Sequence, residues 1–149
     1  MKLNRVNEFK LILPATHNNV SVAINTLDRF LCVNNIVAEQ ASDIKLVITE
    51  ALDNVAYHAY AGNNYENNNM ILDAHIETNN KLVITVADKG VGIADIAQAR
   101  ESLFSTGSPD QHSGMGFTIM ESFMTSLTVS SEPEKGTTVH MRRKLLRKK

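Results

Sequence analysis

The order of apolar periodicities along the chain is the feature that most constrains its fold. The segment "NEFKLILP" alternates like a strand, and helical spacing follows from Thr16, where Thr16 or Asn18 can cap, and again from Ser42, which can also cap. Next come the strand patterns "MILDAHIE" and "KLVITVAD", a long polar stretch, a helix near 117–123, and the strands "SLTVSS" and "TTVHMRRKL". This order predicts an α+β two-layer sandwich, in which helices cover one face of a mixed, mostly antiparallel sheet.

Length and charge narrow the class of protein. A chain of 149 residues that is 43% hydrophobic can bury one core, so we expect a single domain over 1–149. Six of its 15 basic residues lie in the last eight positions, and the acidic remainder argues against nucleic-acid binding. We expect this basic tail, 142–149, to be a solvated strand end that is partly disordered. Cys32 is the only cysteine, and no apolar run suits a membrane span or a signal peptide, which predicts a cytoplasmic protein.

Polar side chains recur at helical spacing on the second predicted helix, at Glu50, Asp53, Asn54, Tyr57 and His58. A solvated helix face accounts for most stripes of this kind. A neutral amide one turn from a carboxylate is a poor ion pair, however, and it suits a hard cation held beside a base. Mg²⁺ takes few protein oxygens and fills its shell with phosphates and water, so Asn54 is a candidate Mg²⁺ ligand.

Two glycine motifs follow. In "ADKGVGI", Ala87 to Ile93, a carboxylate at a strand end precedes two glycines that permit a tight turn and the approach of a flat ligand. In "SGMGF", Ser113 to Phe117, glycines at a helix start expose backbone N–H groups to an anion such as a phosphate chain. Taken singly, the first motif also fits an ordinary turn and the second a capping loop.

The three groups together, in this order within one domain, resemble the GHKL ATPase superfamily of gyrase, Hsp90, histidine kinases and MutL. Glu50 to Asn54, Asp88 to Gly92 and Gly114 to Gly116 match its N, G1 and G2 boxes, and "KGTTVHM" is similar to its Gly-Thr motif. Within the superfamily, "QARESLFST", "SGMGFTIMESFM" and "SEPEKGTT" resemble the anti-sigma F factors, the sporulation stage II protein AB family. The chain departs from that family at Gly107, where a basic residue is expected, and at Ala59, where glycine is usual.

The resemblance implies a set of residue roles. Glu50 would be the catalytic base that accepts the proton of a serine hydroxyl, and Asn54 would hold Mg²⁺. Asp88 would bind the adenine amino group, supported by Thr137. The remaining contacts to ATP or ADP would come from three groups of residues: Gly90, Gly92 and Ile93 in the base pocket, Thr106 in the lid, and Ser113, Gly114, Met115, Gly116 and Phe117 around the phosphates.

The same resemblance implies the activity and the partners. Such a protein would sequester a sporulation sigma factor of the sigma F type and phosphorylate a serine of an anti-anti-sigma partner. It would act as a homodimer, for which the edge strand Glu8 to Leu13 and the first helix are candidate surfaces. Two alternatives stay open: a switch kinase of the general stress response, and a sequestering module that binds nucleotide without transferring phosphate.

Overall fold

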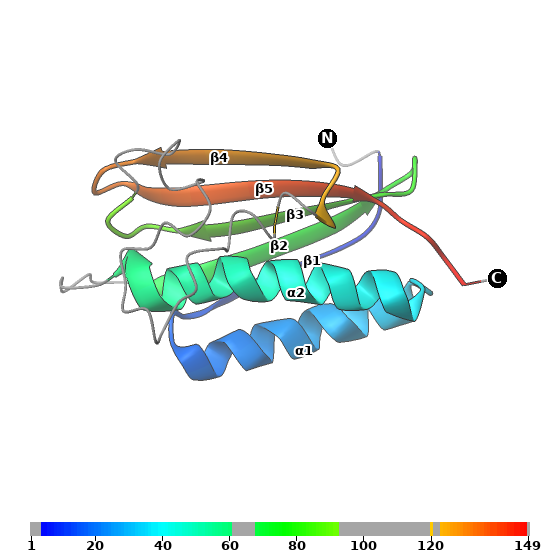
Figure 1. Cartoon of the computed structure of the whole chain (residues 1–149), viewed down its shortest axis with the longest axis horizontal. Helices are drawn as coiled ribbons and strands as arrows, with labels where there is room; N and C mark the ends of the chain where they lie inside the picture. The colour runs from blue at the N-terminus through cyan, green and yellow to red at the C-terminus, as the bar shows by residue number, and fades with distance from the viewer. Residues whose placement is uncertain (1–3, 61–67, 93–119, 121–122, 149) are drawn as a thin grey trace.

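In the part of the chain that the structure describes, one five-stranded sheet is covered on one face by two long helices (Figure 1). The structure is a computed structural model that describes residues 4–60, 68–92, 120 and 123–148. The strand order is β1-β2-β3-β5-β4. The elements are β1 (Arg5–Pro14), α1 (His17–Val33), α2 (Ala38–Asn54), the π-helical turn η1 (Val55–Ala59), β2 (Asn69–Glu77), β3 (Lys81–Asp88), β4 (Ser126–Glu132) and β5 (Gly136–Lys144).

The expected α+β sandwich is confirmed, with one difference in the sheet. Each of the four described strand pairs is antiparallel, so this sheet is antiparallel throughout rather than mixed. The two strands predicted before and after residues 78–80 form the β2–β3 hairpin, with Asn80 at a positive φ of 64°. Strand β1 lies at one edge, as the period-two pattern before Pro14 suggested, and β4 lies at the other.

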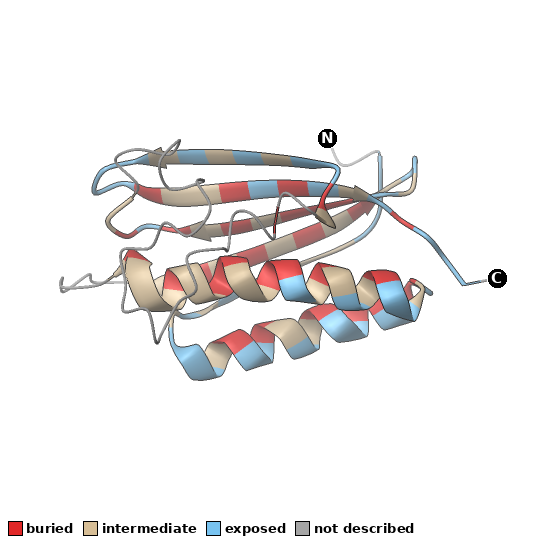
Figure 2. Cartoon of the chain, in the orientation of Figure 1, coloured by how far each residue is buried: buried red, intermediate tan, exposed pale blue. Residues whose placement is uncertain are grey.

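Strand alternation directs one set of side chains toward the helices. On β2 and β3, every second residue is buried, and the residues between them face away from the helices. The buried sides of α1 and α2 face this set (Figure 2), and Met120 and Met124 join the same core. The core between sheet and helices includes Leu27, Leu31, Ile44, Ile48, Leu52, Leu72, Ile76, Leu82 and Ile84.

The two helix starts were predicted with unequal success. Thr16 caps α1, as expected, since its hydroxyl accepts a hydrogen bond from the N–H of Asn19 at 3.3 Å. Ser42 does not cap α2, because the helix already begins at Ala38 after Val37. The N–H of Val37 is bound by the carbonyl of Leu146 at 2.9 Å, a long-range contact that fixes the helix start where no local capping residue is present.

The basic tail continues past β5 along the connection between α1 and α2. Gln40 is only 3% exposed and holds the tail at two points, donating to the Lys144 carbonyl at 2.9 Å and accepting from the N–H of Leu146 at 2.7 Å. Leu145 is buried, and Arg147 donates to the side chain of Asn80 at 2.8 Å. The tail therefore joins the helix layer to the sheet.

No described helix has the length and apolar character that a membrane crossing requires.

Candidate functional site

The end of β3 places Asp88 at the centre of the candidate site. Its side chain follows Leu82, Ile84 and Val86 on the helix-facing side of the sheet, and the residue is only 8% exposed. The backbone N–H of Gly90 donates to its Oδ1 at 2.9 Å, and the main chain of Thr137, its register partner on β5, also hydrogen-bonds the carboxylate. The carboxylate is therefore held in one orientation by backbone donors.

Burial dominates the electrostatics of this carboxylate. Removal from water disfavours the charged form and raises the pKa of Asp88 above its ordinary 3.8, while the hydrogen bonds from Gly90 and Thr137 lower it in part. A buried carboxyl with a raised pKa is a candidate functional group. Such a group is suited to accept a hydrogen bond from a ligand amino group.

The turn after Asp88 passes between two other parts of the chain. A Cβ at Gly90 would lie 1.8 Å from the carbonyl oxygen of Ala59, and one at Gly92, whose φ is +73°, would lie 2.0 Å from that of Glu132. The sequence suggested that these glycines admit a ligand, and the structure gives both of them a reason in internal packing. Their part in a base pocket stays a prediction.

Three main-chain groups of the same turn form hydrogen bonds to other elements. Val91 N–H donates to the carbonyl of Ala59 at 2.6 Å, and the carbonyl of Val91 accepts from Glu134 N–H at 2.6 Å. Lys89 N–H donates to the hydroxyl of Tyr60 at 3.0 Å, and that hydroxyl donates to the carbonyl of Asn69 at 2.6 Å. The end of η1, the end of β3 and the β4–β5 turn are thereby fixed to one another, at the same end of the molecule (Figure 1).

Glu50 and Asn54 lie one turn apart at the end of α2, next to η1. Both are partly buried, as is Asp53 between them. These side chains therefore do not form a fully solvated helix face. Beyond Asn54 the backbone widens into η1, which alters the helical spacing on which the predicted stripe depended for Tyr57 and His58. Turns of this kind occur often at functional sites.

Further polar contacts surround the end of α2. Nδ1 of His17 lies 3.9 Å from Oδ1 of Asp53 and 3.2 Å from the hydroxyl of Tyr57. Within the described residues, there is no group of three or more His, Cys, Asp or Glu side chains that could hold a metal ion. Asn54 stays a predicted Mg²⁺ ligand, because its amide oxygen is of the type that Mg²⁺ accepts.

Thr137 contacts the Asp88 carboxylate through its main chain. Its hydroxyl lies 2.9 Å from the hydroxyl of Ser131, which donates to the carbonyl of Gly136 at 2.9 Å. A serine hydroxyl has one proton, so Thr137 is the donor in this pair. The expected support of Asp88 comes from the Thr137 backbone, and Ser131 holds the side chain.

Several expected site residues lie outside the described part of the chain. They are Ile93, Thr106, Ser113, Gly114, Met115, Gly116 and Phe117, together with Gly107. Sequence reasoning missed Tyr60 and Ser131, whose roles depend on hydrogen bonds across the fold. It also gave Gly136 no role of its own, although the Gly-Thr motif contains it and its φ of +89° requires glycine.

The fold and this site define the class of protein. Residues 13–143, which include both long helices, strands β2, β3 and β4, and Asp88, match the family model of the histidine kinase-like ATPase domain. The anti-sigma F factors of Bacillus licheniformis and Geobacillus thermodenitrificans are 36% and 39% identical to this chain, over 96% of it and 96% of each relative. The chain belongs to the anti-sigma F factor family of these nucleotide-binding domains.

Solved structures agree on the fold. The RsbU and RsbW domains of Rv1364c from Mycobacterium tuberculosis match 96% of this chain and 34% of that one, with a TM-score of 0.71 and 17% identity. A chain of the SiaB–SiaC complex from Pseudomonas aeruginosa matches 95% of this chain and 90% of that one, with a TM-score of 0.65 and 13% identity. At these identities, the likeness concerns the fold alone.

Proposed function

We propose that this protein binds ATP at Asp88 and transfers its terminal phosphoryl group to a serine of a protein partner. The observation that supports this most directly is the buried Asp88 carboxylate, oriented by Gly90 and Thr137. Because backbone donors already fix the carboxylate, it can accept a hydrogen bond from the adenine amino group without reorganising.

Glu50 is the base we propose for the transfer. Its carboxylate would accept the proton of the serine hydroxyl as that oxygen bonds to the terminal phosphorus and the bond from phosphorus to the bridging oxygen of ADP breaks. Phosphoryl transfer depends mainly on positioning and charge neutralisation. Asn54, one turn away, would hold Mg²⁺, which when bound neutralises charge on the phosphates. The partly buried position of both side chains supports these roles.

The partners we propose follow from the family. Because the relatives are named anti-sigma F factors, we infer that this chain sequesters a sigma factor of that type in the cytoplasm and that the phosphorylated serine belongs to an anti-anti-sigma protein. We also propose a homodimer. Strand β1 supports it, since it is an edge strand with Val6 and Ile12 exposed.

The test is phosphoryl transfer from radiolabelled ATP, with Mg²⁺, to a candidate anti-anti-sigma protein. We expect the label on a partner serine with the unaltered protein and at least about 100-fold slower labelling with Glu50→Gln, since general-base catalysis contributes roughly that much. Glu39→Gln is the matched control, because this substitution removes the same charge from an exposed position in the first turn of the same helix.

Each result separates the candidate functions. No label despite tight ATP binding would favour a module that sequesters without kinase activity. Label that survives Glu50→Gln would remove Glu50 from the base role. Pull-down of the sigma factor distinguishes the sporulation type from a general stress-response switch kinase, which would use the same chemistry.

A further inference from the structure

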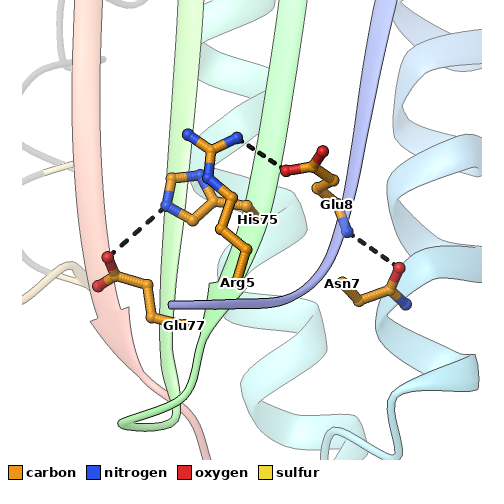
Figure 3. Close-up of polar contacts among 5 residues, drawn as sticks. All are labelled: Arg5, Asn7, Glu8, His75 and Glu77. Carbon is orange, nitrogen blue, oxygen red and sulfur yellow. Dashed lines mark hydrogen bonds and ion pairs between the residues drawn. The ribbon is translucent and has the colours of Figure 1, made fainter. Parts of the chain in front are cut away.

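The face of the sheet away from the helices divides into two halves with different charge patterns. On the β1–β2 half, Arg5 binds Glu8 at 2.8 Å, and Nε2 of His75 lies 3.8 Å from Glu77 (Figure 3). Burial lowers the pKa of His75, so Arg5 is the side chain of these contacts that pairs its positive charge with a carboxylate. On the β4–β5 half lies Arg142, which is exposed and makes no ion pair with any other described residue.

A hollow of about 260 Å³ lies beside this arginine. Among the described residues, two neighbouring cross-strand pairs line it, Ser126 with Arg142 and Thr128 with His140. Since alternate residues of a strand share a face, all four side chains lie on the helix-free side of the sheet. No acidic side chain is among them.

The lining side chains are rich in hydrogen-bond donors. Arg142 offers five N–H groups in a planar fork, and Ser126 and Thr128 each offer a hydroxyl. Nδ1 of His140 lies 2.8 Å from the hydroxyl of Thr85, the register partner of His140 on β3. This contact orients the imidazole, and within the described residues the other ring nitrogen has no hydrogen-bond partner and can contact a ligand.

We propose that this hollow binds a phosphate group, either the free ion or a phosphomonoester. A carboxylate has only two acceptor oxygens, whereas a phosphate group has three or more and can use the guanidinium, the imidazole and both hydroxyls together. Arginine forks match phosphate geometry well and form strong charge-assisted hydrogen bonds with it.

This site is separate from the one at Asp88. The Asp88 side chain is on the helix-facing side of β3, whereas Thr85 and the hollow are on the opposite side. Along the strands, Asp88 pairs with Thr137 at the start of β5, and Arg142 lies near its end. The proposal therefore does not depend on the kinase assignment.

Residue-resolved NMR tests the proposal. The amide signals of residues 126–128 and 140–142 are followed while inorganic phosphate or, separately, O-phosphoserine is added at constant ionic strength. We expect saturable shifts with a dissociation constant on the order of 1 mM, typical of a few charged hydrogen bonds in an open site. Binding of phosphate at the ATP site would be recognised by shifts around Asp88 instead.

Charge-removal variants decide whether the site is specific. Arg142→Gln should weaken binding about tenfold, because hydrogen bonds to charged groups contribute that much, and His140→Gln should weaken it in the same direction. Lys144→Gln is the control, because Lys144 is exposed on the same face of β5 but outside the hollow. It should change the affinity less than about twofold.

Two outcomes would overturn the proposal: shifts that never saturate with either ligand, and equal weakening by Lys144→Gln and Arg142→Gln, which would indicate diffuse attraction. The two ligands distinguish the source of the phosphate. Tighter binding of O-phosphoserine identifies a phosphorylated side chain as the natural ligand, and equal or exclusive binding of inorganic phosphate identifies the free ion.

Discussion

The backbone N–H of Gly90 donates to the carboxylate of Asp88 at 2.9 Å, across a turn of two residues. The same glycine lies so close to Ala59 that a Cβ would meet its carbonyl oxygen at 1.8 Å. One residue thus orients the buried acid and joins the turn to the end of η1. The geometry of the site is therefore tied to the packing of the fold.

The raised pKa of Asp88 predicts a specific pH dependence of stability. Because burial raises its folded-state pKa above 3.8, the folded protein binds the proton more tightly than the unfolded chain does. The carboxyl group's contribution is then fully present below about pH 3.8 and is lost as the pH rises through the folded-state pKa.

We therefore expect the free energy of unfolding of the ligand-free protein to fall, relative to Asp88→Asn, from about pH 3.8 upward until the carboxyl has ionised. Urea unfolding of both proteins between pH 4 and 8 measures this difference. A difference that stays constant across the range, or that grows in favour of the unaltered protein, would show that the pKa is not raised.

Gly136 is predicted to tolerate no side chain. Its φ is +89°, and an added Cβ would lie 2.1 Å from the carbonyl oxygen of Asp88 and 2.6 Å from the Cα of Lys89. Gly136→Ala should cost about 2 kcal/mol or more in the free energy of unfolding, because it adds backbone strain to a main-chain clash. Lys135→Ala, in the same exposed turn, should cost less than about 0.5 kcal/mol. Similar urea midpoints for the two variants would contradict this packing.

The hydroxyl of Tyr60 is predicted to hold the site turn in place. Tyr60→Phe removes a group that accepts from Lys89 N–H and donates to the Asn69 carbonyl, and should cost about 1 to 2 kcal/mol. Amide exchange at Lys89 should accelerate accordingly. Tyr57 lies on the neighbouring turn η1. Tyr57→Phe removes only an exposed contact to His17 and should have little effect on the free energy of unfolding. Unchanged exchange at Lys89 in Tyr60→Phe would argue against this role.

Gln40 is predicted to be the main attachment of the C-terminal tail. Its buried amide binds both Lys144 and Leu146, and Gln40→Ala leaves those main-chain groups without their partner. We expect a loss of about 2 kcal/mol in the free energy of unfolding. The exposed neighbour variant Glu39→Gln should change it by less than about 1 kcal/mol. Equal stability of both variants in urea would mean that the tail is held by other contacts.

Local patterns in the sequence were sufficient to predict the strands and both long helices, but not that every strand pair is antiparallel. Period-two alternation identified β2 and β3, and the cap at Thr16 was visible because it acts over three residues. The start of α2 was placed wrongly, since Val37 is fixed by Leu146 from the far end of the chain. Local signals cannot report such a contact.

The chemical groups of the site could be predicted from the sequence, but the contacts that hold them in place could not. Asp88 could be singled out because a carboxylate between a strand and glycines is a local pattern. The packing role of Gly90 and Gly92 could not be predicted, because the atoms that they approach belong to Ala59 and Glu132. The π-helical turn η1 likewise depends on packing, and so does the role of Tyr60.

Binding of ATP to Asp88→Asn, measured by isothermal titration calorimetry with Mg²⁺ present, tests the central claim most directly. The matched control is Asp73→Asn, which alters the same residue type on the opposite face of the sheet. We expect about 100-fold weaker binding for Asp88→Asn, since a charged hydrogen-bond acceptor is lost, and unchanged binding for Asp73→Asn. Full ATP affinity in a folded Asp88→Asn protein would contradict it.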